Sequence, residues 1–205
     1  MKYFIDTEFR EEPNTIDLIS IGIVSEDGRK YYALNKECNL RKVWKDEWLN
    51  KNVLLPIYID KIHGDMRNHV EFSYSAMKGI FKGFGKTKKE LAKEILYFCS
   101  NGYFDGTGLS YEYAREYDLV GEDRKPKFYG YYADYDWVVF CWIFGRMIDL
   151  PKGFPMYCND LKQMIDEIGL ATTINSTFPQ TNEHNASLAY AEWNFKVYKY
   201  ITKFK

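Results

Sequence analysis

The chain has 205 residues and a formal net charge of −1 at pH 7, with 46% hydrophobic and 28% charged residues. This composition excludes a disordered or fibrous chain and predicts one globular domain over residues 1–205. No apolar run is long enough to cross a bilayer, and no signal-type segment precedes the first strand. We therefore expect a cytoplasmic protein without a membrane partner. A polyanion would have to bind at a local basic patch or through metal ions.

Three β-strands are predicted in succession at the N-terminus. The run Tyr3-Phe4-Ile5 opens the first strand, residues 16–24 are rich in β-branched side chains, and residues 30–34 follow an acidic Asp-Gly turn. A strand that returns directly after such a turn forms a hairpin. The segment therefore predicts an antiparallel meander.

Helices and strands alternate in the rest of the chain. Thr87 and Glu90 form a capping box before a helical pattern that ends near residue 102, and Asp160 is placed to cap the next-to-last helix. The other predicted elements are a short helix at 44–52, strands at 128–132 and 156–158, and helices at 137–147, 161–168 and about 185–204, with loops over most of 58–85 and 105–127. Together they predict an α/β fold in which a mixed sheet is flanked by helices.

Two carboxylates stand where the first strand would ordinarily bury apolar side chains. Side chains two apart on a strand point to the same face, so Asp6 and Glu8 should lie close enough to repel each other unless a cation sits between them. Hard oxygen ligands so placed suit Mg²⁺ or Mn²⁺. An isolated Asp-x-Glu is more often a strand end that has simply reached water, so the other segments have to support the metal site.

Two further segments place polar side chains at junctions between elements, where active residues of α/β sheets concentrate. Asp134-Tyr135-Asp136 follows a predicted strand, and one of its aspartates is alternatively a helix cap. Glu183-His184-Asn185 opens the last helix, where a lone histidine is more often a surface or capping residue. Each segment alone is a weak signal.

Taken together, the segments resemble the DEDDh family of 3′-5′ exonucleases, the RNase T-like group with the ribonuclease H-like fold. The resemblance is carried by residues 3–9, 17–22, 131–137 and 183–186. The chain looks like the small bacterial and phage exoribonucleases of that group, including the mycobacterial type. The resemblance covers most of the chain, apart from the segments at 58–85 and 102–127.

The resemblance implies hydrolysis of RNA from its 3′ end by a two-metal mechanism that releases nucleoside 5′-monophosphates. It assigns Asp6, Glu8 and Asp136 to two Mg²⁺ or Mn²⁺ ions, and His184 to the general base. It also implies that two chains pair as a homodimer. Four residues beside these are expected to contact the substrate, two of them by stacking on the terminal base: Thr7, Asn185, and the aromatic pair Phe9 and Tyr135.

The fourth acid of the family is missing from its expected place. The family places it five residues after the histidine, and counting from His184 gives Ala189, while Tyr190 and Glu192 fall elsewhere. Three explanations stay open: a deliberate Asp→Ala change that preserves substrate, natural loss of catalysis, and a different ligand set. In each of the first two, the chain as written is severely impaired.

Two other functions remain as alternatives. One is hydrolysis of short or cyclic oligonucleotides, as would suit a phage that counters a host signal. The other is a protein that binds nucleic acid or nucleotides and has lost its metal. The sequence does not separate RNA from DNA, because the contact to the 2′-hydroxyl depends on side chains that it does not place.

Weaker signals lie outside these motifs. Gly83-Phe84-Gly85-Lys86-Thr87 is similar to a phosphate-binding loop, but Ile80 stands where the leading glycine belongs. The four separated cysteines predict reduced thiols rather than disulfides. A basic run is either a solvated face or a ridge that guides a nucleic-acid strand: Lys78, Lys82, Lys86, Lys88, Lys89 and Lys93.

Overall fold

A mixed six-stranded sheet forms the centre of the molecule. The computed structural model describes residues 1–62, 70–100, 125–179 and 186–204. The strand order is β4-β3-β2-β1-β5-β6, antiparallel within β1–β3 and parallel at the other pairings. This confirms the mixed sheet with its N-terminal antiparallel meander. The strands are β1 (Lys2–Glu12), β2 (Thr15–Ser25), β3 (Lys30–Asn35), β4 (Gly85–Lys86), β5 (Lys127–Gly130) and β6 (Asn159–Asp160).

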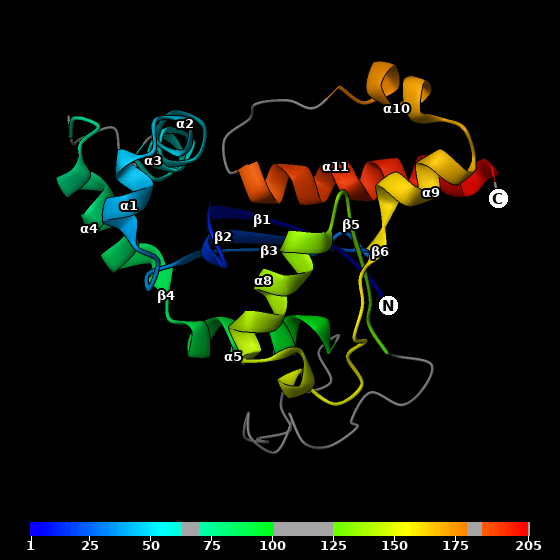
Figure 1. Cartoon of the computed structure of the whole chain (residues 1–205), viewed down its shortest axis with the longest axis horizontal. Helices are drawn as coiled ribbons and strands as arrows, with labels where there is room; N and C mark the ends of the chain where they lie inside the picture. The colour runs from blue at the N-terminus through cyan, green and yellow to red at the C-terminus, as the bar shows by residue number, and fades with distance from the viewer. Residues whose placement is uncertain (63–69, 101–124, 180–185, 205) are drawn as a thin grey trace.

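Helices cover both faces of the sheet (Figure 1). One face carries α11 and the group α1–α4, and the other carries α5 and α8. The helices are α1 (Leu40–Lys45), α2 (Glu47–Leu49), α3 (Leu55–Ile62), α4 (Tyr74–Phe84), α5 (Lys88–Cys99), α8 (Asp134–Phe144), α9 (Leu161–Glu167), α10 (Ala171–Thr177) and α11 (Ala186–Ile201). Single helical turns of other types lie at Asn50–Leu54, Met147–Asp149 and Thr202–Phe204.

Alternation along β1 divides the core between these two faces. Tyr3 and Ile5 are fully buried against α5 and α8, whereas Phe4 is buried against α9 and α11. Asp6 and Glu8 continue the alternation that begins at Phe4 and therefore point toward the α11 side. A β-bulge between Glu8 and Phe9 interrupts the register directly after these acids. Bulges commonly re-aim side chains beside active sites.

The expected loop at 58–85 is wrong, because α3 and α4 fill most of its described part. Met77, Ile80 and Phe81 are buried at helical spacing on α4, although Gly79 and Gly83 lower its intrinsic helix propensity. Tertiary burial of this apolar stripe decides the structure. The expected strand at 156–158 is also wrong, since β6 begins at Asn159, and α10 was not predicted. The segment expected as a loop at 105–127 lies mostly outside the described residues.

Several local predictions are confirmed. Thr87 and Glu90 form the reciprocal capping box of α5, and the Asp160 carboxylate accepts a hydrogen bond of 3.0 Å from the Gln163 N–H at the start of α9. The four cysteines are free thiols. No helix in the described ranges is long and apolar enough to span a membrane.

Candidate active site

The carboxylates of β1 lie beneath the first turns of α11. Asp6 pairs in register with Gly22 of β2, and Glu8 pairs with Ser20. The helix backbone lies so close to Gly22 that an added Cβ would fall 2.5 Å from the Leu188 backbone. Only glycine permits this approach. Because residues opposite each other in a ladder share a face, Asp6 and Glu8 face the same helix.

Asp136 reaches the same place from the start of α8, on the other side of the sheet. Its carboxylate Oδ1 accepts hydrogen bonds from the Thr7 hydroxyl and from the Thr7 backbone N–H, the latter at 2.8 Å. Asp136 is 7% exposed and Thr7 is 6% exposed. The residue between the two acids of β1 thus fixes the orientation of the third. The contact that the structure shows for Thr7 is this one, and its contact with substrate stays a prediction.

The alternative that an aspartate caps α8 is wrong. Ala133 is the capping residue and contributes no side-chain hydrogen bond, while Asp134 and Asp136 lie inside the first turn. The Ala133 N–H instead donates to Asp160 Oδ2 at 2.8 Å. Asp136 is therefore held by Thr7 of β1, and it is free of a helix-capping role.

Burial and neighbouring negative charges raise the pKa of all three carboxylates. Burial, followed by the negative charges of Asp136 and Glu8, holds the pKa of Asp6 well above its usual range. Burial and the charge of Asp136 raise the pKa of Glu8 to about 8. Burial raises the pKa of Asp136 to about 6, although the hydrogen bonds from Thr7 act in the opposite direction. Crowded carboxylates with no cation beside them are a costly arrangement.

The donor set fits a divalent cation in its chemistry. All three groups present hard oxygen atoms, and none of them forms an ion pair with a described lysine or arginine. Within the ranges that the structure describes, no three ligand-type side chains are already gathered closely enough to hold a metal ion. Like charges without a cation repel, so these carboxylates would have to draw closer together as the ion binds.

One side of α11 faces the acids, and Tyr190 belongs to it. Ser187, Ala191 and Asn194 are buried at helical spacing; the Ser187 hydroxyl lies 3.0 Å from the Ser20 hydroxyl, and Asn194 Nδ2 donates to the Ile5 carbonyl at 2.9 Å. Tyr190 lies within this stripe. Burial and the charges of Glu8 and Asp6 raise the pKa of its phenol.

Ala189 occupies a different side of the same helix. It is two residues from Ser187 and two from Ala191, and residues at that spacing do not share a face. Glu192 is likewise turned away, since it forms an ion pair of 2.6 Å with Lys30. The described part of α11 therefore brings a phenol toward Asp6 and Glu8, and no carboxylate. Counting from the histidine does not single out Tyr190. Its place on the same side of α11 as Ser187, Ala191 and Asn194 does.

His184 and Asn185 lie outside the described residues, so the predicted general base and its neighbour stay predictions. The description of the helix begins at Ala186, whose side chain is likewise not described. The assignment of Ala189 to the vacant ligand position rests on counting from His184. It stays a prediction for the same reason.

An aromatic pair stands beside the acids. The rings of Phe9 and Tyr135 meet edge to face, with centroids 5.8 Å apart and an interplanar angle of 80°. Phe9 is half-buried, Tyr135 is 46% exposed, and the Tyr135 hydroxyl donates to Glu11 Oε1 at 3.2 Å. Each ring belongs to the residue next to a carboxylate of the cluster, since Phe9 follows Glu8 and Tyr135 precedes Asp136. The pair therefore offers an accessible ring surface next to Glu8 and Asp136.

Comparisons with known proteins extend over nearly the whole chain. Residues 1–202 match the model of the 3′-5′ exoribonuclease Rv2179c-like domain. Two proteins of Mycobacterium tuberculosis, the 3′-5′ exoribonucleases MT2234.1 of strain CDC 1551 / Oshkosh and Rv2179c of strain ATCC 25618 / H37Rv, are each 27% identical over 171 residues, covering 82% of this chain and 76% of theirs. The chain therefore belongs to the family of Rv2179c-like 3′-5′ exoribonuclease domains.

Proposed function

We propose that this protein is a 3′-5′ exoribonuclease of the DEDDh type with a ribonuclease H-like fold. The observation that carries the proposal is that Asp136, from a distant segment, lies near enough to Asp6 and Glu8 for its charge to raise the pKa of both, an arrangement that a cation would relieve. The antiparallel meander followed by parallel strands supports the fold assignment. The names of the mycobacterial relatives support the activity.

The proposed reaction is hydrolysis of the terminal phosphodiester. A water oxygen bonds to the phosphorus and the bond from phosphorus to the 3′ oxygen breaks. The 3′ oxygen takes a proton from solvent, so that a nucleoside 5′-monophosphate leaves and the shortened RNA ends in a new 3′-hydroxyl. His184 would accept the proton of the water. Thr7 holds Asp136 in place, and Phe9 with Tyr135 would stack on the terminal base. Bound Mg²⁺ or Mn²⁺, held by the three carboxylates, would supply Lewis-acid activation and neutralise the phosphate charge.

A second candidate has one observation in its favour. The sheet-facing side of α11, from Ser187 to Asn194, carries Tyr190 where a fourth carboxylate would complete the site. We therefore also propose that the chain as written turns over slowly and holds a nucleic-acid end more readily than it cleaves it. The separate idea of a cyclic substrate has no structural observation behind it.

The test of the proposed function uses RNA labelled at its 5′ end. With Mn²⁺ the label should move through a ladder of products that shorten one nucleotide at a time, and RNA carrying a blocking 3′-phosphate should resist. The Asp136→Asn variant should produce no ladder. Internal cleavage, or cleavage of circular RNA, would contradict an exonuclease that acts on a free 3′ end.

A further inference from the structure

A cavity of about 550 Å³ opens between the connection from β3 to α1 and one side of α4. None of the residues that line it is acidic, and four are cations: Lys36, Arg41, Lys78 and Lys82. The buried side chains of Leu40 and Phe81 contribute its apolar surface, and Tyr74 stands at its edge with 37% of its surface exposed. We call this cavity the basic pocket. Cationic walls around apolar and aromatic surface match a ligand with both phosphates and rings.

Three of the four cations have no ion-pair partner among the residues that the structure describes. Lys36 pairs with Glu90 at 3.1 Å, but no ion pair among the described residues includes Arg41, Lys78 or Lys82. Other cations of the neighbourhood are paired already, Lys42 with Glu12 and Lys86 with Glu94. Three cations without a described ion-pair partner thus line one cavity, whereas Lys88, Lys89 and Lys93 of the basic run, which also lack one, lie on α5 outside it.

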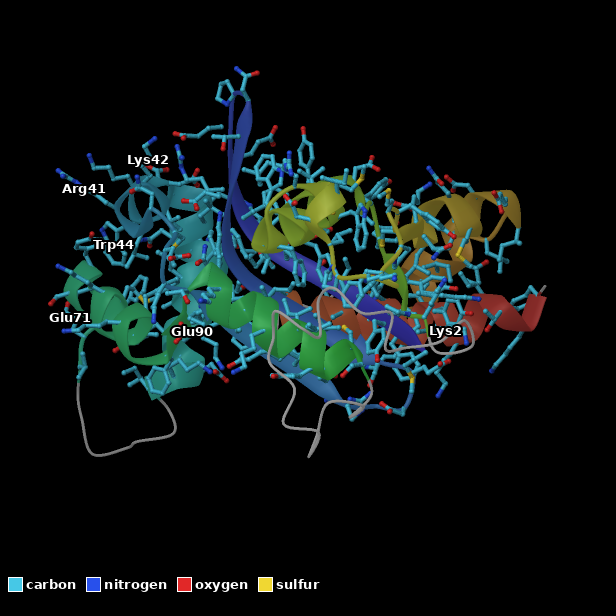
Figure 2. The ribbon with its side chains drawn as sticks, turned by 90° about the horizontal axis from the view of Figure 1, so that it is seen from below. Lys2, Arg41, Lys42, Trp44, Glu71 and Glu90 are labelled. Carbon is cyan, nitrogen blue, oxygen red and sulfur yellow. The ribbon has the colours of Figure 1, made fainter. Side chains whose placement is uncertain are left out.

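The ring of Tyr74 is held beside a second aromatic side chain. Tyr74 meets Trp44 of α1 edge to face, with centroids 5.9 Å apart, and Trp44 in turn contacts Phe72 at 5.1 Å. Figure 2 shows Arg41, Lys42 and Trp44 at one end of the molecule and Lys2 at the other. An exposed ring that is fixed by its neighbours can stack on a base with little further ordering.

The basic pocket and the acids lie over the same face of the sheet. Glu8 pairs with Ser20, Ser20 pairs with Leu34, and Leu34 is buried among residues of α1, α3 and α4. Lys36 follows Leu34 by two residues. Two strand spacings and two residue rises separate Lys36 from Glu8, which is about 12 Å between backbones. A strand whose 3′ end reaches the acids would need only a few nucleotides to reach the pocket.

We propose that the basic pocket binds the phosphates of single-stranded RNA a few nucleotides upstream of the 3′ end, with Tyr74 against a base. This proposal rests on the proposed function for its choice of RNA. The net charge of −1 gives the chain no general attraction to a polyanion. The local positive charge of the pocket would supply that attraction. The pocket would bind the upstream part of the RNA while the acids bind its 3′ end.

The test reverses the three unpaired charges together in an Arg41→Glu, Lys78→Glu, Lys82→Glu variant. Binding of a labelled oligouridylate of about 12 nucleotides, measured by fluorescence anisotropy over a range of salt concentrations, should weaken by about 10- to 100-fold. The slope of log affinity against log salt should fall in magnitude by about 2, because three phosphate contacts are lost. Manganese-dependent hydrolysis of a dinucleotide, which is too short to reach the pocket, should be unchanged.

A matched control reverses three exposed lysines elsewhere, Lys127→Glu, Lys152→Glu and Lys196→Glu, with the same change in net charge. Its affinity and salt slope should stay near those of the unaltered chain. Equal weakening in both variants would show a general charge effect and overturn the proposal. Unchanged binding in the pocket variant would overturn it as well. If polyglutamate binds the unaltered chain but not the pocket variant, while both proteins bind RNA equally well, the pocket binds an acidic peptide instead of RNA.

Binding without divalent metal separates this proposal from the proposed function. If the unaltered chain binds the long RNA through the pocket but cleaves no dinucleotide with Mn²⁺, the proposed function fails and the pocket stands. A second measurement places 4-thiouridine at single positions of the oligonucleotide. Crosslinks to the peptide that contains Tyr74 should come from positions a few nucleotides upstream of the 3′ end. Crosslinks to that peptide from the terminal nucleotide would contradict the proposed direction of the strand.

Discussion

The acids of β1 and α8 and the cations of the basic pocket differ in how much free energy their charges cost the folded state. Asp6 and Glu8 of β1 are half-buried and Asp136 of α8 is buried, and the charge of Asp136 raises the pKa of both acids of β1. The cations of the basic pocket, by contrast, stand at the surface in water. Buried like charges oppose folding, and they persist where a ligand uses them. Exposed cations cost little and are common on any surface. The acids therefore point to a bound ion more strongly than the pocket points to RNA.

The largest expected effect comes from restoring a fourth carboxylate to the acidic region. Because Tyr190 faces Asp6 and Glu8, we expect Tyr190→Asp to raise Mn²⁺-dependent release of nucleotide by more than about a hundredfold. The count from His184 predicts the gain for Ala189→Asp instead. End-labelled RNA and matched protein concentrations give both rates. Equal turnover by both variants and the unaltered chain would refute the missing-ligand explanation.

The next effect is on stability and depends on pH. The pKa of Glu8 is raised to about 8, so the folded state disfavours its ionised form. The free energy of unfolding of the metal-free protein should therefore fall as pH rises from about 4.5 toward 8, and then level off. At pH 8 Glu8→Gln should add roughly 1–3 kcal/mol, measured by urea denaturation. Glu167→Gln, at an exposed acid, should change nothing; a destabilised Glu8→Gln protein would contradict the electrostatic account.

Thr7→Val examines how Asp136 is held. The change keeps the backbone N–H donor at 2.8 Å but removes the hydroxyl donor, so the pKa of Asp136 should rise further above about 6. Loss of the buried hydrogen bond should destabilise the fold by about 1–2 kcal/mol. Thr7→Ser, which keeps the hydroxyl, is the matched control. Titration of Asp136 by carbon-detected NMR checks the direction, and a lower pKa in Thr7→Val would contradict it.

The smallest effect concerns the aromatic surface beside the acids. Tyr135→Ala should weaken binding of a 3′-terminal dinucleotide by about 5- to 10-fold, since a stacked base contributes on the order of 1 kcal/mol or more. Tyr157→Ala removes a ring that is 64% exposed elsewhere and serves as the control. Equal affinities for the two variants would show that Tyr135 packs against Phe9 without serving the substrate.

Patterns among residues that are close in sequence correctly predicted local features of the structure. Alternation along β1 places Asp6 and Glu8 on one face, and the capping signals at Thr87 and Asp160 mark the helix starts that the structure shows. These features depend on residues within one or two turns of each other. The sequence could also place Asp136 at a junction between elements, but its hydrogen bonds with Thr7 join residues 129 positions apart.

Long-range packing decided what the sequence did not reveal. The glycines of α4 obscure its helical pattern in the sequence. The segment is a helix because Ile80 and Phe81 pack against other apolar residues of the core. The face of α11 that meets the acids is set by the contact of its backbone with Gly22. A count from His184 carries no information about that contact, and its choice of Ala189 stays a prediction.

Titration calorimetry of Mn²⁺ into the unaltered chain and into Asp136→Asn addresses the central claim most directly. Carried out near pH 7 in buffers of different ionisation enthalpy, it reports both affinity and proton release. Because the pKa of Glu8 is raised to about 8, metal binding should release protons, and Asp136→Asn should weaken binding by at least about tenfold. Binding of equal strength in both proteins, with no proton released, would show that these carboxylates do not hold the ion.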